Sequence, residues 1–313
     1  MNKYMLLIAL SLQIQISNAQ DSTQNSVLWR IKSVDSKNES YLFGTLHGIC
    51  TNHIKLKSKV LNILNQANTL VFECNYSGYD PYKSERINIF IPIPIADFII
   101  GLPIFSIPRD VSTNDFLPNT DVLKEIMEEE KYNFVNQFFK DSLHVKKGVK
   151  PYQRFKPIIT QFVVENSMNG CPIGSYEEYV GHKMANIIYK YKGLETKDEH
   201  SLVLHKYKSD WEIAENLYSI SKNYSKIKSE YKKNYVESIK QYDLENLNYF
   251  ISNPDDEQDK VFVIDRNLSW MPKITKLIKN SNTVIAVGVG HLAGEYGLIN
   301  LLKKSGYILE PIF

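Results

Sequence analysis

The fold is decided by residues 41–73, which read YLFGTLHGICTNHIKLKSKVLNILNQANTLVFE. Two apolar runs in this stretch, Tyr41–Leu46 and Leu70–Glu73, have the length and composition of β-strands. Between them, residues 57–67 carry apolar side chains at helical spacing. A strand, a helix and a second strand in this order form a βαβ unit, whose strands run parallel in one sheet. We therefore predict an α/β fold built on this unit.

Other segments extend the predicted sheet on both sides of this unit. Residues 27–34 alternate in the manner of a strand and, with a polar turn at residues 35–39, form an N-terminal β-hairpin. Three further strands are predicted at residues 191–195, 284–289 and 308–312. The predicted class is α/β with α+β character: a central mixed sheet with parallel core strands, the hairpin, and a large helical insertion. The insertion separates two Gly-x-x-His motifs, at residues 44–47 and 288–291.

Capping residues and spacing predict several helix boundaries. Thr196 and Glu199 fit a capping box, with Thr196 directly before a helix. Residues 211–242 repeat apolar side chains every three or four positions and predict one long helical region. Asn253, followed by a proline and two aspartates, predicts another helix start. Pro272 predicts a break in that helix or the start of the next.

The composition is that of a globular protein. The chain has 313 residues, of which 43% are hydrophobic and 23% charged, enough for one large domain or two modest ones. Lys+Arg 37 nearly balances Asp+Glu 35, so the charge gives no indication of nucleic acid as a partner. We see no internal linker or repeat and expect a single domain over residues 20–313.

Residues 1–19 have the three parts of a secretory signal peptide. Lys3 supplies the positive charge, residues 4–16 are mostly apolar, and Ser17-Asn18-Ala19 offers small residues before a cut after Ala19. The alternative is a membrane anchor, but the apolar run is shorter than the about 20 residues that span a bilayer. We expect cleavage, no transmembrane anchor afterwards, and an exported protein that is periplasmic or secreted.

The segment Ile87–Pro108 is almost wholly apolar and reads INIFIPIPIADFIIGLPIFSIP. Its four prolines exclude a regular membrane-spanning helix. The segment either packs over the core in an extended form or makes an apolar flap that touches a membrane near a site.

The chain has three cysteines, Cys50, Cys74 and Cys171. An exported protein can keep disulfides, but three cysteines cannot all pair internally. A Cys50–Cys74 bridge is possible, because Cys50 lies three residues past His47 and Cys74 directly follows Glu73 on the expected next strand.

Three polar side chains stand where apolar strands end: His47, Glu73 and His291. Ligands of an open parallel sheet bind beyond the carboxyl ends of its strands, so these side chains converge if their strands are neighbours. Two imidazoles and a carboxylate suit a divalent metal, or a base with its orienting partners. Taken alone, a histidine at a strand end is more often a hydrogen-bonded loop residue. His200 and His205 lie roughly 140° apart around a helix, which does not suit a metal pair.

Glycines accompany both motif histidines. Gly44 and Gly288 each lie three residues before a histidine and Gly290 directly precedes the second, so that backbone can approach a ligand closely. A near match to a dinucleotide fingerprint begins at Gly288, but the chain ends too soon after it for the next strand and its acidic residue. We therefore expect no nucleotide cofactor.

In the order of its motifs the chain resembles the TraB/GumN family, in the superfamily that includes the Tiki metalloproteases and, more distantly, the erythromycin esterases. The two Gly-x-x-His motifs near either end of the domain are the family's signature. The other matching segments, in chain order, are Leu28–Ile31, Leu70–Glu73, Phe155–Pro157, Gly193–Thr196, Asp265–Asn267 and Val287–Leu292. The resemblance covers residues 27–313. One departure is that relatives often end the acidic strand with Glu-x-Asp, whereas residues 73–75 here are Glu-Cys-Asn.

The resemblance implies roles for individual residues. The family's histidines map onto His47 and His291, and its strand-end glutamate maps onto Glu73. The arginine of its Arg-Asn pair maps onto Arg266, with Asn267 beside it. Tiki-like members are similar to metal-dependent peptidases, with manganese or cobalt as the expected metals; zinc also suits such ligands.

From these assignments we expect an exported, metal-dependent, peptidase-like hydrolase in which water attacks a peptide or small carbonyl substrate. His47, Glu73 and His291 would hold the metal. Glu73 would also accept the proton of water, and Arg266 would stabilise the oxyanion or a substrate carboxylate. Glu195 is either a supporting residue of this site or a structural carboxylate at a helix start. The alternative function is a non-catalytic extracellular protein that sequesters a peptide in the same cleft.

Overall fold

The computed structural model describes residues 25–33, 36–74, 117, 121–185, 187–188 and 190–313. The predicted signal peptide at residues 1–19 and the apolar segment Ile87–Pro108 lie outside these ranges. Within them, no helix combines the length and the apolar character that crossing a membrane requires.

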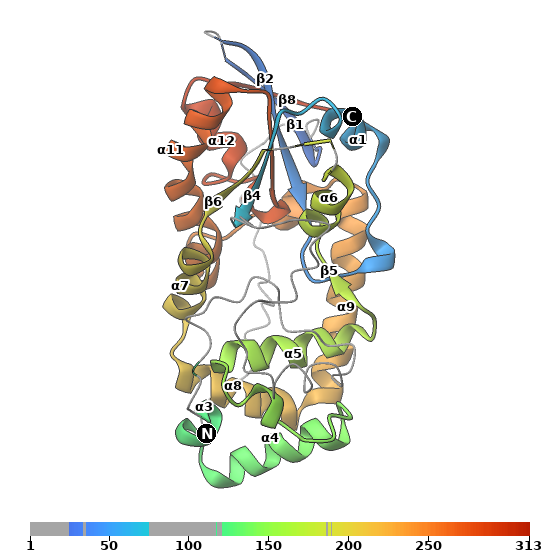
Figure 1. Ribbon diagram of the computed structural model, residues 1–313, viewed down its shortest axis with the longest axis vertical. Coiled ribbons are helices and arrows are strands. Elements are labelled where there is room, and N and C mark those ends of the chain that lie inside the picture. Colours follow the sequence, from blue (N-terminus) through green and yellow to red (C-terminus); the bar gives the residue numbers. More distant parts are fainter. Residues whose placement is uncertain (1–24, 34–35, 75–116, 118–120, 186, 189) are drawn as a thin grey trace.

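A six-stranded mixed sheet lies in the upper half of the molecule as drawn in Figure 1. Its strands, in spatial order, are β6 (Tyr191–Glu195), β4 (Thr69–Cys74), β7 (Thr283–Gly288), β2 (Ser36–Thr45), β1 (Leu28–Ser33) and β8 (Ile308–Pro311). Strands β6, β4, β7 and β2 pair in parallel, whereas β1 is antiparallel to both β2 and β8. The predicted α/β class, parallel core strands and N-terminal hairpin are confirmed.

The parallel register aligns the carboxyl ends of the four core strands. Thr45 at the end of β2 pairs with Gly288 at the end of β7, and Cys74 at the end of β4 pairs with Glu195 at the end of β6. All residues of β4 are buried, as expected for a strand covered on both faces. Side chains at and beyond these strand ends therefore gather at one edge of the sheet.

Helices flank the sheet on both sides (Figure 1). The flanking helices are α1 (Ser58–Leu64) and α6 (Tyr176–Met184) on one side, and α11 (Asp265–Asn280) and α12 (Leu298–Lys304) on the other. Their apolar faces share one core with the strands, in which Leu42, Ile285 and Trp270 are fully buried. Helix α7 (Lys197–Tyr207) follows β6 and begins with the predicted capping box of Thr196 and Glu199.

A second hydrophobic core lies in the helical layer that faces the carboxyl ends of the strands, in the lower half of Figure 1. It is built from α3 (Val122–Ile126), α4 (Glu129–Asp141), α5 (Pro157–Asn169), α8 (Asp210–Lys222) and the first part of α9 (Tyr224–Asp243). Helix α9 joins the two layers, because Ile227 packs in the helical core and Tyr242 in the sheet core. This layer is the predicted helical insertion.

Residues 211–242 are helical as predicted, but they form two helices, because Asn223 leaves helical geometry with φ −110° and ψ 20°. Two predicted helix boundaries are wrong. The helix predicted to start at Asn253 starts later: Asp256 accepts the Asp259 N–H and caps α10 (Glu257–Asp259). A π-helical turn, η5 (Lys260–Ile264), then leads into α11. Pro272 lies inside α11 without ending it.

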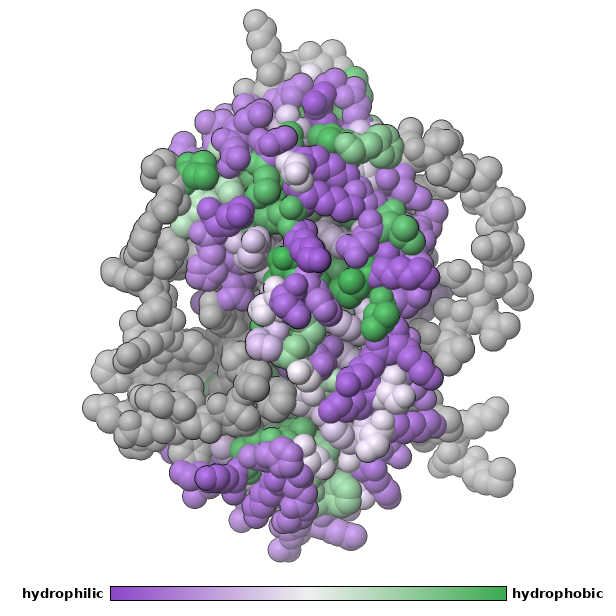
Figure 2. Space-filling view, turned by 90° about the vertical axis from the view of Figure 1, so that its right-hand side faces the viewer, coloured by the Kyte–Doolittle hydropathy of each residue, from purple (hydrophilic) through white to green (hydrophobic). Residues whose placement is uncertain are grey.

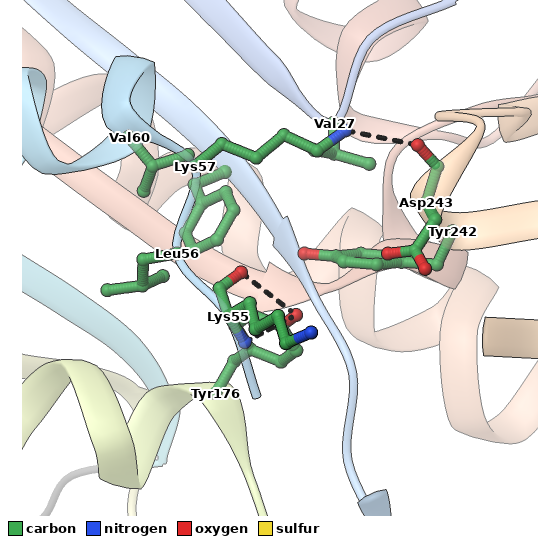
Figure 3. Close-up of a pocket in the computed structure, with 9 residues that line it drawn as sticks. Val27, Lys55, Leu56, Lys57, Val60, Tyr176, Tyr242 and Asp243 are labelled. Atoms are coloured by element: carbon green, nitrogen blue, oxygen red, sulfur yellow. Dashed lines mark hydrogen bonds between the residues drawn. The ribbon is translucent and has the colours of Figure 1, made fainter. Parts of the chain in front are cut away.

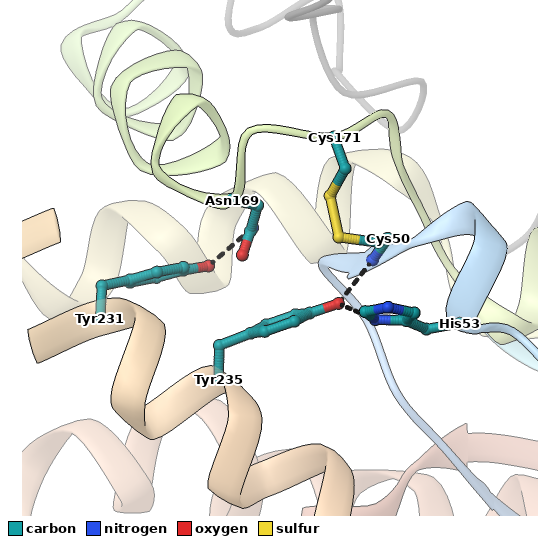
Figure 4. Close-up of a disulfide and its surroundings, with 6 residues drawn as sticks. All are labelled: Cys50, His53, Asn169, Cys171, Tyr231 and Tyr235. Atoms are coloured by element: carbon teal, nitrogen blue, oxygen red, sulfur yellow. Dashed lines mark hydrogen bonds between the residues drawn. A yellow bond between two sulfur atoms is a disulfide. The ribbon is translucent and has the colours of Figure 1, made fainter. Parts of the chain in front are cut away.

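A small two-stranded sheet lies outside the main one. It pairs β3 (Ile49–Cys50) with β5 (Ile173–Gly174), and a disulfide joins Cys50 to Cys171 beside it (Figure 4). The predicted Cys50–Cys74 bridge is therefore wrong. The physical reason is that β3 leaves the main sheet to pair with β5, whereas Cys74 stays buried at the end of β4.

The remaining short elements are η1 (Thr51–His53), η3 (Lys150–Tyr152), η4 (Leu247–Phe250) and η6 (Val289–His291). Figure 2 shows a face of the molecule on which hydrophilic side chains predominate and apolar ones form small separate groups. Such scattered apolar groups are ordinary for a protein surface.

Candidate metal centre and hydrolytic site

The structure brings the three strand-end residues of the sequence analysis together. Nε2 of His47 lies 3.4 Å from Oε1 of Glu73, and Nε2 of His291 lies 3.6 Å from the same oxygen. Glu73 is within β4, whereas the histidines belong to the segments that follow β2 and β7. The alignment of the parallel strand ends therefore produces this cluster.

The carboxylate of Glu73 is held from two sides. Its Oε1 accepts the backbone N–H of Gly288 at 2.7 Å, and its Oε2 accepts an Arg266 N–H at 2.6 Å. Burial alone would raise the pKa of Glu73, but Arg266 first, and then His291 and His47, together outweigh this effect and hold that pKa well below its usual value. Glu73 is therefore ionised at neutral pH, with both oxygens already engaged.

A side chain would be crowded at two of the predicted glycine positions. A Cβ on Gly288 would lie 3.2 Å from Oε1 of Glu73, and one on Gly44 would lie 2.8 Å from the side chain of Leu292. A Cβ on Gly290 would meet the Phe250 carbonyl at 3.8 Å, an ordinary contact. Close approach of backbone to the carboxylate thus explains Gly288 but not Gly290.

Arg266 bridges two carboxylates on neighbouring strands. Its Nε and one terminal nitrogen donate to Glu195, at 3.3 Å and 2.6 Å, and that terminal nitrogen also donates to Glu73. The other terminal nitrogen donates to the Phe262 carbonyl at 3.1 Å and faces Nε2 of His291 at 3.3 Å. A guanidinium has five N–H donors, and these contacts use all five.

Asn267 fixes the tautomer of His291. Its Nδ2 donates to the carbonyls of His291 and Tyr296, at 3.1 Å and 2.8 Å, so its Oδ1 accepts from Nδ1 of the His291 ring at 2.8 Å. The lone pair of His291 is then on Nε2, facing Arg266. Burial first, and then the charge of Arg266, lower the pKa of His291 to about 3, so the ring is neutral at pH 7.

Glu195 belongs to this network rather than to the cluster around His47. Besides its bonds to Arg266, its Oε1 lies 2.6 Å from Nδ1 of His200, and its Oε2 accepts the Trp270 indole N–H at 3.3 Å. The Trp270 ring also lies 4.6 Å from the guanidinium and 4.6 Å from the His291 ring. His200, which helical spacing excluded as half of a metal pair, is thus a partner of the Glu195 carboxylate.

The structure adds one residue that the sequence analysis missed, Glu177 in the first turn of α6. Its side chain is buried, and its Oε1 lies 3.0 Å from Nε2 of His47 and accepts the hydroxyl of Thr45. Its Oε2 is buried without a hydrogen-bond partner among the described residues. The sequence signal was only that of a helix start, where Ser175 caps the helix and acidic residues are common.

His47, Glu73 and Glu177 together fit a divalent cation. One donor atom from each lies within 4.8 Å of the others, and an imidazole with two carboxylates suits Mn²⁺, Co²⁺ or Zn²⁺. The Oε2 of Glu177, unpartnered among the described residues, supports a ligand at this site, either a metal or a water molecule beside it, because a buried carboxylate oxygen without a partner is unfavourable. The His47 side chain is 48% exposed, so the cluster is reached from solvent.

The two carboxylates also act on the charge of His47. Partial burial lowers the pKa of His47, but Glu177 and then Glu73 raise it, with a net result well above the usual value. Without a metal, His47 is therefore the cation between the two carboxylates. A metal would take over this role and displace the proton.

A small pocket lies beside the sheet, and none of the three cluster residues lines it (Figure 3). Its walls include Phe43, Tyr176 and Tyr242, and the Tyr242 hydroxyl donates to the Gly44 carbonyl at 2.7 Å. Lys57 donates to the Asp243 carbonyl at its rim at 3.1 Å. These contacts hold the end of α9 against β2, the strand that leads to His47.

The model of one protein family, described as the TraB/PrgY/gumN family, matches residues 27–89 and 106–311. No curated protein and no solved structure matches the chain.

Proposed function

Because the chain belongs to the TraB/PrgY/gumN family, we propose that it is a metal-dependent hydrolase, peptidase-like, that activates water at the cluster of His47, Glu73 and Glu177. The observation that carries the proposal is the donor set itself. Its atoms lie within 4.8 Å of one another, and one buried carboxylate oxygen of Glu177 has no hydrogen-bond partner among the described residues. We place the activity outside the cytoplasm, on the signal-like residues 1–19.

The metal would be held by His47, Glu73 and Glu177, and it would polarise a carbonyl and make water more acidic. We propose that Glu177 accepts the proton of the attacking water. Sequence analysis assigned this role to Glu73. However, both Glu73 oxygens already accept hydrogen bonds, whereas Oε2 of Glu177 accepts none among the described residues. The attacked substrate would be a peptide or a small carbonyl compound.

Arg266 and His291 are assigned to positioning. The sequence-based role of Arg266, binding an oxyanion, needs a donor that the protein has not used, and all five of its donors have partners in the structure. His291 offers its only lone pair to Arg266. Together they hold the Glu73 carboxylate in one orientation toward His47.

The first experiment measures the metal content of purified protein covering residues 20–313, and then cleavage of a peptide library with and without chelator. The proposal predicts a bound divalent metal and cleavage that chelator abolishes and added Mn²⁺ or Co²⁺ restores. Peptide binding without cleavage at any metal loading would favour the non-catalytic, sequestering function instead.

A further inference from the structure

The two halves of the metal cluster are held in different ways. Glu73 belongs to β4, a strand of the main sheet paired on both sides, and is fixed there by Gly288 and Arg266. His47 and Glu177 lie outside the main sheet, on two segments that are far apart in the sequence. The distance between His47 and Glu177 therefore depends on what joins residues 45–51 to residues 171–177.

These two segments are joined along their length. The Tyr176 N–H donates to the Leu46 carbonyl at 3.1 Å, and the Thr51 N–H donates to the Pro172 carbonyl at 3.0 Å. Between these bonds β3 pairs with β5, with Ile49 opposite Gly174. His47 and Glu177 thus face each other at one end of a short antiparallel pairing.

The Cys50–Cys171 disulfide closes the other end of this pairing. It links residues 121 positions apart, with a Cα–Cα distance of 5.7 Å. The Cys50 N–H also donates to the Tyr235 hydroxyl of α9 at 2.9 Å, and that hydroxyl lies 3.0 Å from Nδ1 of His53 (Figure 4). A two-stranded pairing of this length is only marginally stable by itself. The disulfide therefore contributes much of the stability that keeps the two segments together.

We propose that the Cys50–Cys171 disulfide is a positioning element of the metal cluster, so that His47 and Glu177 form one site only in the oxidised protein. This inference rests on the proposed function, because it concerns metal binding by the same residues. It makes metal affinity dependent on the redox state of a bond that contacts neither metal nor substrate. Such dependence suits a protein that works in an oxidising compartment.

The test is titration of Mn²⁺ into the oxidised full-length domain, and into the same protein after reduction by a water-soluble phosphine. In the reduction one phosphine becomes its oxide, taking the oxygen of one water. The sulfur–sulfur bond breaks; the phosphine supplies two electrons and the water supplies two protons, which together give two thiols. We expect the dissociation constant for Mn²⁺ to rise at least about tenfold, the usual effect of losing a supporting group of a metal site.

The matched control is the Cys50→Ser/Cys171→Ser double variant. It should bind Mn²⁺ as the reduced protein does and show no response to the phosphine, which excludes an effect of the reductant on the metal. Hydrogen exchange adds a readout without metal. In reduced protein the amides of Thr51 and Tyr176 should lose protection, while those of β4 and β7 keep theirs.

The outcomes separate this inference from the proposed function. If oxidised and reduced protein bind Mn²⁺ equally, the positioning role is overturned and the metal site stands. If the oxidised protein binds no metal, the proposed function fails, and this inference fails with it. If reduction unfolds the whole domain, with loss of its circular dichroism spectrum at 25 °C, the disulfide serves the fold rather than the site, and the inference is overturned.

Discussion

Nε2 of His47 lies 3.0 Å from Oε1 of Glu177, and the same histidine nitrogen lies 3.4 Å from Oε1 of Glu73. One imidazole is therefore shared by two carboxylates that come from different elements, α6 and β4. Two carboxylates this close repel each other unless a cation lies between them. Protonated His47 provides that cation in the metal-free protein, and a divalent metal would provide it more strongly.

Glu177→Gln should remove metal binding and activity together. Glutamine keeps the shape of the side chain but has neither the negative charge nor the proton-accepting oxygen. Hydrolysis should fall roughly 10²–10⁴-fold, the usual contribution of general acid–base catalysis. The melting temperature of the metal-free protein should fall as well, because the substitution removes the buried charge that Nε2 of protonated His47 faces at 3.0 Å.

Glu178→Gln is the matched control for this variant, since Glu178 is the next residue of the same helical turn and its side chain is 32% exposed. It should keep both metal affinity and rate. Equal losses in the two variants would show that the turn, and not Glu177, is responsible.

Glu73→Gln should lower stability as well as rate. The substitution removes the negative charge that Arg266 faces at 2.6 Å in a buried environment. Arg266 keeps its second ion pair, with Glu195. Removing one partner of a buried ion pair costs about 3 kcal/mol at the lower end of measured values. Urea unfolding and peptide hydrolysis should be measured on the same preparation. Near-normal hydrolysis beside lowered stability would make Glu73 a structural carboxylate only.

The metal-free protein should lose stability as the pH falls from 6.5 toward 3. The pKa of His291 is about 3 in the folded protein and 6.5 ordinarily, so between these values the unfolded chain binds a proton that the native state does not. Urea unfolding with chelator present, at several pH values between about 4 and 6.5, measures the slope. His291→Gln should reduce this slope by up to about 1.4 kcal/mol per pH unit.

His47 acts with the opposite sign and in another pH range. Its pKa is raised in the folded protein, so its contribution to stability is complete below its ordinary 6.5 and is lost as the pH rises through the raised value. Below pH 6.5, a His47→Gln variant should therefore show the same slope of unfolding free energy against pH as the parent protein. A His291→Gln variant with the unchanged slope of the parent protein would contradict the assignment of a neutral, buried His291.

Sequence patterns predicted the strands and the residues at their ends because those signals are local. The apolar runs before His47, Glu73 and His291 end close to the ends of the strands. Parallel pairing of these strands then brings the three side chains to the same edge of the sheet. Glu177 gave no such signal, because an acidic residue in the first turn of a helix is common whatever its function.

The contacts that bring Glu177 and Cys171 to the site are long-range and involve strands of only two residues. No periodicity develops over so short a length, so neither the β3–β5 pairing nor the correct disulfide followed from spacing. The chain has an asparagine where relatives often have a second strand-end carboxylate, at residue 75. In the structure the second carboxylate near His47 comes from α6 instead.

Arg266→Lys distinguishes positioning from oxyanion binding. Lysine keeps the positive charge, but its single nitrogen cannot span Glu73, Glu195 and His291 as the planar guanidinium does. If Arg266 positions the Glu73 carboxylate, the variant should lose about 2–3 kcal/mol of stability, somewhat less than outright removal of a buried partner. Its affinity for Mn²⁺ should fall several-fold, because Glu73 is no longer held in one orientation.

If Arg266 instead bound the oxyanion, kcat alone would fall, while melting temperature and Mn²⁺ affinity stayed near those of the parent protein. Lys260→Arg is the control, since Lys260 is an exposed cation in the turn that precedes the same helix and its exchange should change none of the three quantities.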